Sequence, residues 1–151
     1  RSSAASDVYK RQLTDKYACV VANPPYMGSG SMNAGLKNYV NGQYSEGKAD
    51  LFSVFMYVAM RLLVDKGKMG MINMQSWMFL SSFEDLRNTF LSEYHFDNML
   101  HLGPRTFDEL GGEVVQNTAF VISKDRPNND TTGEYYRLVE GKIALIRNNC
   151  S

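Results

Sequence analysis

The residues Tyr17-Ala18-Cys19-Val20-Val21-Ala22 run directly into the tetrapeptide Asn23-Pro24-Pro25-Tyr26. The first six residues form a short apolar run with β-branched side chains, which predicts a buried strand. A long polar, glycine-rich loop is expected to follow, up to Lys48. Open α/β sheets bind ligands beyond the carboxyl ends of their strands. A strand that ends on this tetrapeptide therefore indicates a functional site.

The tetrapeptide itself has an unusual backbone chemistry. A residue before proline is pushed toward an extended conformation, and proline has a fixed φ angle and no N–H. The backbone carbonyls are therefore held rigidly as free acceptors, and the Asn23 side-chain oxygen is another acceptor nearby. Two rigid acceptors can bind both hydrogens of one NH₂ group, and Tyr26 offers a flat face to a planar ring. The pattern predicts a site for an amino group on a planar heterocycle; a proline-stiffened turn with an aromatic plug is the alternative.

The rest of the chain alternates between helix and strand patterns. Helices are expected from Leu51 to Val64 and from Phe83 to Tyr94, with Phe55 and Leu91 among the inward-facing side chains. Asp50 is expected to be an N-cap or a first-turn acid of the first helix. Further strands are expected at residues 69–74, 96–102 and 117–123. This order implies a doubly wound α/β sheet. We expect its last two strands to pair antiparallel.

Composition narrows the class of protein. The chain has 151 residues, of which 44% are apolar and 21% charged, as is usual for one globular domain. Sixteen basic and sixteen acidic residues give zero net charge. This excludes a nucleic-acid binder that works by bulk positive charge, but not a local basic patch. The two distant cysteines, Cys19 and Cys150, exclude a disulfide framework and a thiolate zinc site, and they fit a reducing cytoplasm. No apolar run approaches the roughly 20 residues of a membrane span, so no membrane is expected. No metal is expected either.

Both ends of the chain are expected to lie outside the catalytic unit. Residues 1–12 contain little that could pack, and we interpret them as a disordered tail or a sequencing artefact. A partial catalytic domain is expected over residues 13–125. Residues 126–151 are interpreted as a turn-rich linker and the truncated start of a following region. The late apolar run Ile143–Ile146 has no evident partner in the chain.

The segment Val20-Val-Ala-Asn-Pro-Pro-Tyr26 resembles the catalytic motif of adenine-N6 DNA methyltransferases. The resemblance extends to three further segments, Lys48–Phe55, Met71–Ser82 and Phe107–Gln116. Together they are similar to the adenine methyltransferases of BREX phage-defence systems, a group related to Eco57I-type restriction-modification enzymes. The resemblance covers residues 14–124. It implies the C-terminal half of a Rossmann-like, S-adenosylmethionine-dependent methyltransferase fold.

The resemblance implies a site-specific DNA adenine-N6 methyltransferase with S-adenosyl-L-methionine as its cofactor. Its target would be an adenine flipped out of double-stranded DNA. Asn23, Pro24, Pro25 and Tyr26 would form the catalytic motif. The Asn23 side chain and the Pro24 carbonyl would accept hydrogen bonds from adenine N6, so that catalysis rests on positioning and electrostatics without a covalent enzyme intermediate. Tyr26 would stack on the flipped base.

Other residues receive roles by the same resemblance. Phe107 stands where related enzymes place a second aromatic side chain against the base. Asp50, Leu51 and Phe52 match the helix start that borders the cofactor pocket. For Trp77, the only tryptophan, two interpretations remain open: a residue that lines the site, or a core or lid residue.

Weaker signals come from isolated charged residues. The long loop from Met27 to Gly47 carries Lys37, which together with Lys48 is a candidate for contacts to DNA phosphates. A solvated lid without DNA contacts is the alternative. His95 and His101 are isolated from each other, and we interpret both as structural.

The sequence also departs from the family pattern. The family binds its cofactor through a glycine-rich loop that comes before the catalytic motif, and no such segment precedes Val20. A region that would recognise the DNA target is also not found. We therefore expect the isolated chain to be inactive, although its parent protein would act on DNA in the cytoplasm with other phage-defence subunits as partners. The motif alone is shared with protein-glutamine and rRNA-guanine methyltransferases, so these functions remain open, as does a non-catalytic assembly subunit.

Overall fold

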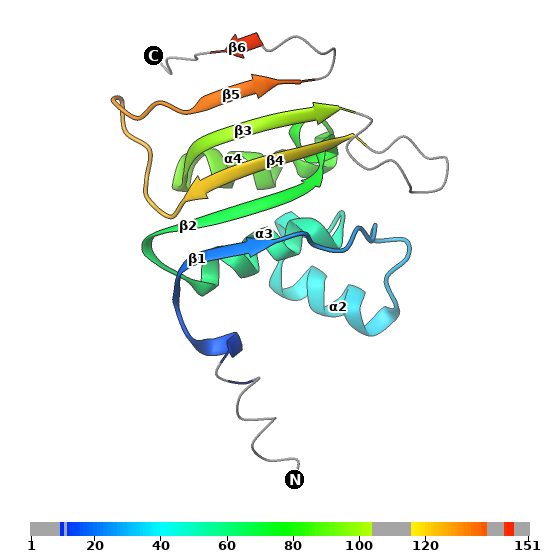
Figure 1. Ribbon diagram of the computed structural model, residues 1–151. Coiled ribbons are helices and arrows are strands. Elements are labelled where there is room, and N and C mark those ends of the chain that lie inside the picture. The colour runs from blue at the N-terminus through cyan, green and yellow to red at the C-terminus, as the bar shows by residue number, and fades with distance from the viewer. Residues whose placement is uncertain (1–9, 11, 104–115, 139–143, 147–151) are drawn as a thin grey trace.

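A six-stranded mixed sheet forms the centre of the protein (Figure 1). The computed structural model describes Lys10 and residues 12–103, 116–138 and 144–146. In the order in which they lie side by side, the strands are β1 (Tyr17–Ala22), β2 (Leu63–Met74), β4 (Asn117–Ser123), β3 (His95–Gly103), β5 (Glu134–Arg137) and β6 (Ala144–Ile146). All four expected strands are present, and β1 and β4 have the predicted bounds.

The strand directions show a mixed sheet. Strand β1 runs parallel to β2, whereas β4 is antiparallel to both of its neighbours, β2 and β3. The predicted antiparallel pairing of the last two expected strands is therefore confirmed. Strand β5 adds parallel to β3, and β6 pairs antiparallel with β5. The apolar run near residue 145 thus has a partner, and the expectation that it has none was wrong. The proposed domain boundary at residue 125 stays a prediction.

The first strand is less buried than its apolar sequence predicts. Strand β1 lies at one edge of the described sheet, with β2 as its only neighbour there. Val20 and Ala22 pack against the core, but Val21 is 78% exposed and Cys19 is exposed. An apolar strand is buried on both faces only where other elements cover both faces. The sequence pattern could not reveal the edge position.

Helix α3 (Leu51–Leu62) joins β1 to β2 and packs on the sheet. Its buried face carries Phe52, Met56, Ala59 and Met60, a spacing that matches one side of a helix. Phe55 was expected to face inward but is 38% exposed. The helix is apolar over most of its circumference, so periodicity alone did not identify the side that meets the sheet. The helix ends two residues earlier than expected, and β2 begins directly after it, six residues earlier than expected.

Helix α4 (Glu84–Glu93) follows two short 3-10 helices, η2 (Gln75–Met78) and η3 (Ser81–Phe83). Leu86 and Phe90 are buried, as predicted, but Leu91 is 58% exposed and not inward-facing. The rings of Phe90 and Tyr57 meet edge to face at 5.2 Å, which places α4 beside α3 on the same face of the sheet. That face forms the main core.

The expected loop between residues 27 and 47 contains an unpredicted helix, α2 (Ala34–Gln43), followed by η1 (Ser45–Gly47). The Asn33 side chain caps α2 by accepting a hydrogen bond from the Leu36 N–H at 2.9 Å. A small apolar cluster of Met32, Val40, Tyr44 and Val54 holds the helix against α3. Two glycines and two asparagines lower the helix propensity of this segment, which explains why the sequence pattern was misleading. Lys37 and Lys48 are exposed, and their contact with DNA stays a prediction.

The helices of this fold are short. Among the described residues, none of them combines the length and the apolar character that crossing a bilayer would require.

Candidate active site

The segment Asn23–Tyr26 lies where several strands end at one edge of the sheet. Because β1 and β2 are parallel, the carboxyl end of β2 lies beside that of β1. The antiparallel strand β4 begins at the same edge, where Asn117 pairs with Met74 of β2 and Gly103 of β3. We call this edge, with the segment Asn23–Tyr26, the motif end of the sheet. It is the place where open α/β sheets bind ligands.

Tyr26 is held at the motif end by two contacts. Its hydroxyl donates a hydrogen bond to Oδ1 of Asn117 at 3.0 Å. Its ring meets Phe52 edge to face, with centroids 6.2 Å apart and planes at 84°. Burial and then the negative charge of Asp50 raise the pKa of Tyr26, so the phenol remains a neutral donor. The side chain is still 36% exposed, which leaves part of the ring accessible.

The two prolines of the tetrapeptide present backbone acceptors without backbone donors. Asn23 is exposed, Pro24 is buried and Pro25 is exposed. The two prolines have no N–H, so the backbone at these positions can only accept hydrogen bonds. The roles of these residues in catalysis stay predictions. What the structure adds is their location beside Tyr26, at a strand end.

Asp50 joins the motif to the start of helix α3. Its Oδ1 atom accepts hydrogen bonds from the Met27 N–H at 2.9 Å and from the Phe52 N–H at 3.2 Å. The predicted N-cap is thus confirmed. Two backbone hydrogen bonds reinforce the connection, from Leu51 to Met27 at 2.9 Å and from Ser29 to Ala49 at 3.0 Å. The chain leaving Tyr26 is therefore fixed against the helix.

The three residues assigned to the cofactor have different surroundings. One carboxylate oxygen of Asp50 is engaged in capping, as described above. Leu51 is half-buried against the small cluster around α2, and Phe52 is fully buried beneath Tyr26. Their contact with a cofactor stays a prediction. Phe107, the second expected stacking residue, lies outside the described residues.

Trp77 is a core residue. It is 3% exposed, stacks on Phe96 at 6.1 Å between ring centroids and meets Phe120 edge to face at 5.4 Å. Its indole N–H donates to the Thr118 hydroxyl at 3.4 Å, and that hydroxyl donates to Oδ1 of Asn73 at 3.3 Å. Thr118 and Asn73 are fully buried. A buried polar network therefore lies directly behind the motif end.

Several polar residues at the motif end were not assigned from the sequence. Gln75 donates its backbone N–H to the Gln116 carbonyl at 2.9 Å, and the two side-chain amides are also hydrogen-bonded. His101 lies near them, and the exposed Phe79 ring is 6.3 Å from its imidazole. Burial and then the charge of Arg137 lower the pKa of His101, against a smaller opposing effect of Gln116. The sequence offered a signal for these residues, because Gln75 and Gln116 border the ends of two predicted strands that meet at one edge of the sheet.

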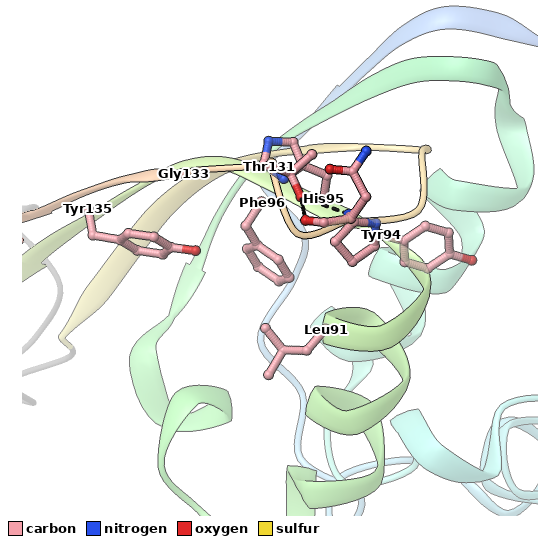
Figure 2. Close-up of a pocket in the computed structure, with 9 residues that line it drawn as sticks. Leu91, Tyr94, His95, Phe96, Thr131, Gly133 and Tyr135 are labelled. Atoms are coloured by element: carbon pink, nitrogen blue, oxygen red, sulfur yellow. Dashed lines mark hydrogen bonds between the residues drawn. The ribbon is translucent and has the colours of Figure 1, made fainter. Parts of the chain in front are cut away.

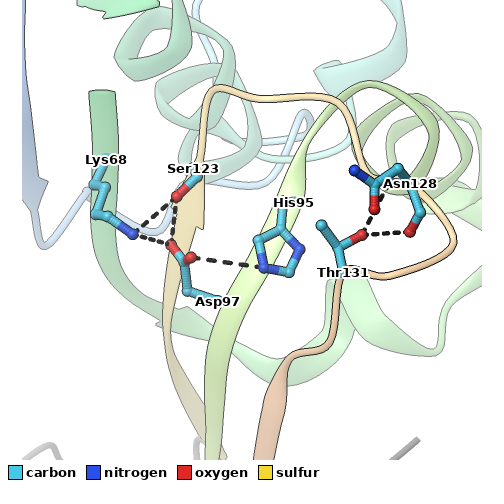
Figure 3. A network of polar contacts seen from close by, with 6 residues as sticks. All are labelled: Lys68, His95, Asp97, Ser123, Asn128 and Thr131. Carbon is cyan, nitrogen blue, oxygen red and sulfur yellow. Dashed lines mark hydrogen bonds and ion pairs between the residues drawn. The ribbon is translucent and has the colours of Figure 1, made fainter. Parts of the chain in front are cut away.

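The other end of the same strands carries a charged network (Figure 3). Lys68 contacts Oδ2 of Asp97 at 3.0 Å and donates to the Ser123 hydroxyl at 3.0 Å. That hydroxyl donates to the same carboxylate oxygen at 2.6 Å, and Nε2 of His95 lies 3.7 Å from Oδ1 of Asp97. We call this edge, where Lys68 pairs with Ser123 and Ser123 with His95, the opposite end.

A hollow of about 300 Å³ lies beside this network (Figure 2). It is lined by Leu91 and Tyr94 from the end of α4, by Phe96 of β3 and by the segment that leads into β5. The turn in that segment is closed by Asn128 and Thr131. None of the residues assigned from the sequence to catalysis or cofactor binding lines it.

Comparisons with known proteins agree with this architecture. A model of the family described as Eco57I restriction-modification methylase matches residues 2–107. The chain is 45% identical over 137 residues to adenine-specific methyltransferase BrxX of Escherichia coli O9:H4 (strain HS), covering 91% of this chain and 11% of that protein. It is 46% identical over 130 residues to adenine-specific methyltransferase PglX of Lacticaseibacillus casei (strain Zhang), covering 86% of this chain and 11% of that protein. The chain thus spans about a tenth of the length of these relatives.

Solved structures show the same fold at low sequence identity. The restriction-modification enzyme MmeI in complex with DNA matches with a TM-score of 0.67 and 14% identity, over 85% of this chain and 18% of that one. The M protein of the type I restriction enzyme EcoKI matches with a TM-score of 0.57 and 19% identity, over 89% of this chain and 27% of that one. The expected fold class, part of a methyltransferase fold, is confirmed. The chain belongs to the Eco57I restriction-modification methylase family.

Proposed function

We propose that this chain is the adenine-holding part of an adenine-specific DNA methyltransferase in a restriction-modification or BREX phage-defence system. The observation that carries the proposal is the segment Asn23–Tyr26, which lies at a strand end with its aromatic ring held in place. Membership of the methylase family and the names of both curated relatives support it. The reaction is methyl transfer from S-adenosylmethionine to N6 of an adenine in double-stranded DNA.

Asn23 and Pro24 act on the reacting amino group. The Asn23 amide oxygen and the Pro24 carbonyl accept the two N6 hydrogens, which orients the nitrogen and stabilises the positive charge that grows on it. When bound, S-adenosylmethionine would supply the methyl group and leave as S-adenosylhomocysteine, while N6 forms the new bond to carbon and releases one proton to water. Because the prolines carry no N–H, no backbone donor at these two positions competes for the nitrogen lone pair.

Tyr26 holds the flipped adenine by stacking. Extruding a base from the duplex costs a few kcal/mol. Stacking on an aromatic side chain returns about 1–3 kcal/mol per base. The partly exposed and doubly anchored ring of Tyr26 suits this role. The stacking offsets much of the cost of flipping.

The surroundings of the helix α3 start fit a cofactor in part. Asp50 and Leu51 are only partly buried, so both can border a bound S-adenosylmethionine. Asp50 keeps its second carboxylate oxygen as an acceptor, since capping is done by Oδ1. Phe52 is fully buried, so its side chain acts from beneath the site by supporting Tyr26.

The other functions that share the motif have less support. Methylation of a protein glutamine or an rRNA guanine needs similar acceptors, but both curated relatives are named adenine-specific. DNA is the proposed partner, and the fold match to an enzyme solved in complex with DNA is consistent with this. Other phage-defence subunits are further proposed partners.

The test is methyl transfer by the complete protein that contains this chain. Wild type and Asn23→Ala are given labelled S-adenosylmethionine and unmethylated plasmid DNA, and N6-methyladenine is measured after digestion to nucleosides. Removing one preorganised contact to the reacting group typically costs about 100-fold or more in rate, which is the loss we expect. Asn128→Ala is the matched control, because Asn128 lies in an exposed turn away from the motif end.

Two results would contradict the proposal. One is undiminished adenine methylation by Asn23→Ala. The other is transfer of label to ribosomal RNA or to a glutamine peptide, in parallel assays, with none to the plasmid.

A further inference from the structure

We propose that Asn117 is the positioning residue that fixes the Tyr26 ring in its base-stacking orientation. The inference rests on the proposed function and deepens it. The Tyr26 hydroxyl donates to Oδ1 of Asn117 at 3.0 Å, across 91 positions of sequence. Asn117 is 2% exposed, so this acceptor is shielded from competing water. No part of the sequence resemblance assigns a role to this residue.

The position of Asn117 makes it a rigid anchor. It opens β4, which lies between β2 and β3, and it pairs with Met74 on one side and Gly103 on the other. A side chain attached to such a backbone has little freedom to move. Functional groups supported in this way keep their geometry better than groups on loops.

Two contacts together restrain the ring of Tyr26. The hydrogen bond to Asn117 holds the hydroxyl tip, and the edge-to-face contact with Phe52 holds the side of the ring at 84°. Rotation about the side-chain bonds of Tyr26 would break one contact or the other. The exposed part of the ring is therefore presented to an incoming base without the entropy cost of ordering a free tyrosine.

The chemistry of the pair suits a buried site. Burial and the nearby Asp50 charge keep the Tyr26 phenol protonated, so it donates. A neutral amide oxygen accepts this hydrogen bond without the desolvation cost that a carboxylate would carry. The pair thus joins a neutral donor to a neutral acceptor at neutral pH.

The experiment is a double-mutant cycle in the complete protein. Tyr26→Phe removes the donor and keeps the ring, and Asn117→Leu removes the acceptor at similar size. We expect each to lower the single-turnover rate of methylation of plasmid DNA about tenfold, which corresponds to one hydrogen bond. Since both delete the same interaction, the double variant should be about as slow as either single variant. The affinity for S-adenosylmethionine should not change.

Thr118→Val distinguishes a positioning role of Asn117 from a general effect on the stability of the protein. It removes a buried hydroxyl beside Asn117 without touching Tyr26, so it should lower the melting temperature but keep the rate per folded protein within about twofold of wild type. Asn117→Asp, which retains an acceptor, should recover part of the rate lost in Asn117→Leu. A duplex with 2-aminopurine at the adenine that the wild type methylates gives a second readout. Its fluorescence should rise in Asn117→Leu, because the flipped base stacks less well.

The outcomes distinguish this inference from the function on which it rests. The inference is overturned if Asn117→Leu methylates at the wild-type rate while Tyr26→Phe is slow, or if the two losses multiply in the double variant. It is also overturned if Thr118→Val is slowed as much as Asn117→Leu, since stability would then explain both. If Asn23→Ala methylates as well as wild type, the proposed function fails instead.

Discussion

The two ends of strands β2, β4 and β3 are built from different chemistry. At the motif end, Asn117 pairs with Met74 and Gly103, and the hydrogen bonds made by the side chains of Asn117 and Thr118 join neutral groups: amides, a phenol and a hydroxyl. At the opposite end, six residues back along β2, Lys68 pairs with Ser123 and both contact the Asp97 carboxylate. Asn117 is 2% exposed, whereas the Lys68 side chain is 55% exposed.

This difference shows which end can hold a precise geometry. Surface ion pairs such as Lys68–Asp97 contribute about 0–1 kcal/mol, because water screens them and long side chains lose entropy. Buried neutral hydrogen bonds avoid the desolvation cost of charges, and leaving one unmade costs about 1–3 kcal/mol. The motif end therefore tolerates fewer rearrangements than the opposite end. Three predictions test this contrast.

The largest effect is expected from Trp77→Ala. The side chain is buried behind the motif end against Phe96 and Phe120, so its removal should lower the free energy of unfolding by about 3–5 kcal/mol. Urea denaturation measures this change. Phe79→Ala is the matched control, because that aromatic side chain is 63% exposed two residues further on. It should change stability by less than about 0.5 kcal/mol. Equal losses in the two variants would contradict the core assignment of Trp77.

A smaller effect is expected when an aspartate is removed from either end. Asp50→Ala removes the cap of α3 and the acceptor for Met27, and should cost about 1 kcal/mol of stability. Without this link to helix α3, the segment Asn23–Tyr26 is held less firmly, so the rate of methyl transfer should also fall about fivefold. Asp97→Ala removes only the charged network at the opposite end, so it should cost about 0–1 kcal/mol and leave methyl transfer unchanged.

Asp50→Asn is a control for the comparison of Asp50→Ala with Asp97→Ala. Asparagine caps helices about as well as aspartate, so this variant should recover most of the lost stability. If Asp97→Ala slowed methylation as much as Asp50→Ala, the difference inferred between the two ends would be contradicted. Thermal unfolding and the plasmid methylation assay give the two measurements.

The smallest effect concerns the pH dependence of stability at the motif end. Burial and the charge of Arg137 hold the pKa of His101 below its ordinary value of 6.5 in the folded state. The unfolded chain therefore binds a proton more readily, and stability is lost as the pH falls below about 6.5. His101→Gln should flatten the decline in melting temperature between about pH 7 and 5. An identical pH profile for wild type and variant would show that His101 does not contribute.

Local signals in the sequence predicted the elements that local physics controls. The Asp50 cap and the strand 117–123 are both confirmed. A cap depends on a side chain and the next few backbone groups, and an alternating or apolar run depends on neighbours in sequence. Such features are visible without knowing the rest of the fold.

The errors concern burial and packing, which depend on distant segments. Helix α2 was missed because its glycines disfavour a helix, while packing around Val40 stabilises one. Phe55 and Leu91 were assigned inward, but neighbouring elements cover other faces of their helices. Strand β1 was expected to be buried, yet it lies at the edge of the described sheet. In each case tertiary contacts determined which side of an element is covered.

The features of the candidate site fall into the same two groups, those set by the local sequence and those set by distant contacts. The sequence by itself determined the stiff acceptors of Asn23–Tyr26, because the covalent structure of two prolines sets φ and removes both N–H groups. It also determined that this segment follows a strand. Only the tertiary structure decided that the Tyr26 hydroxyl meets Asn117, 91 residues away, and that Phe52 packs against the ring. The physical reason is that β4 enters the sheet antiparallel beside β2, which brings its first residue to the strand end where the motif begins.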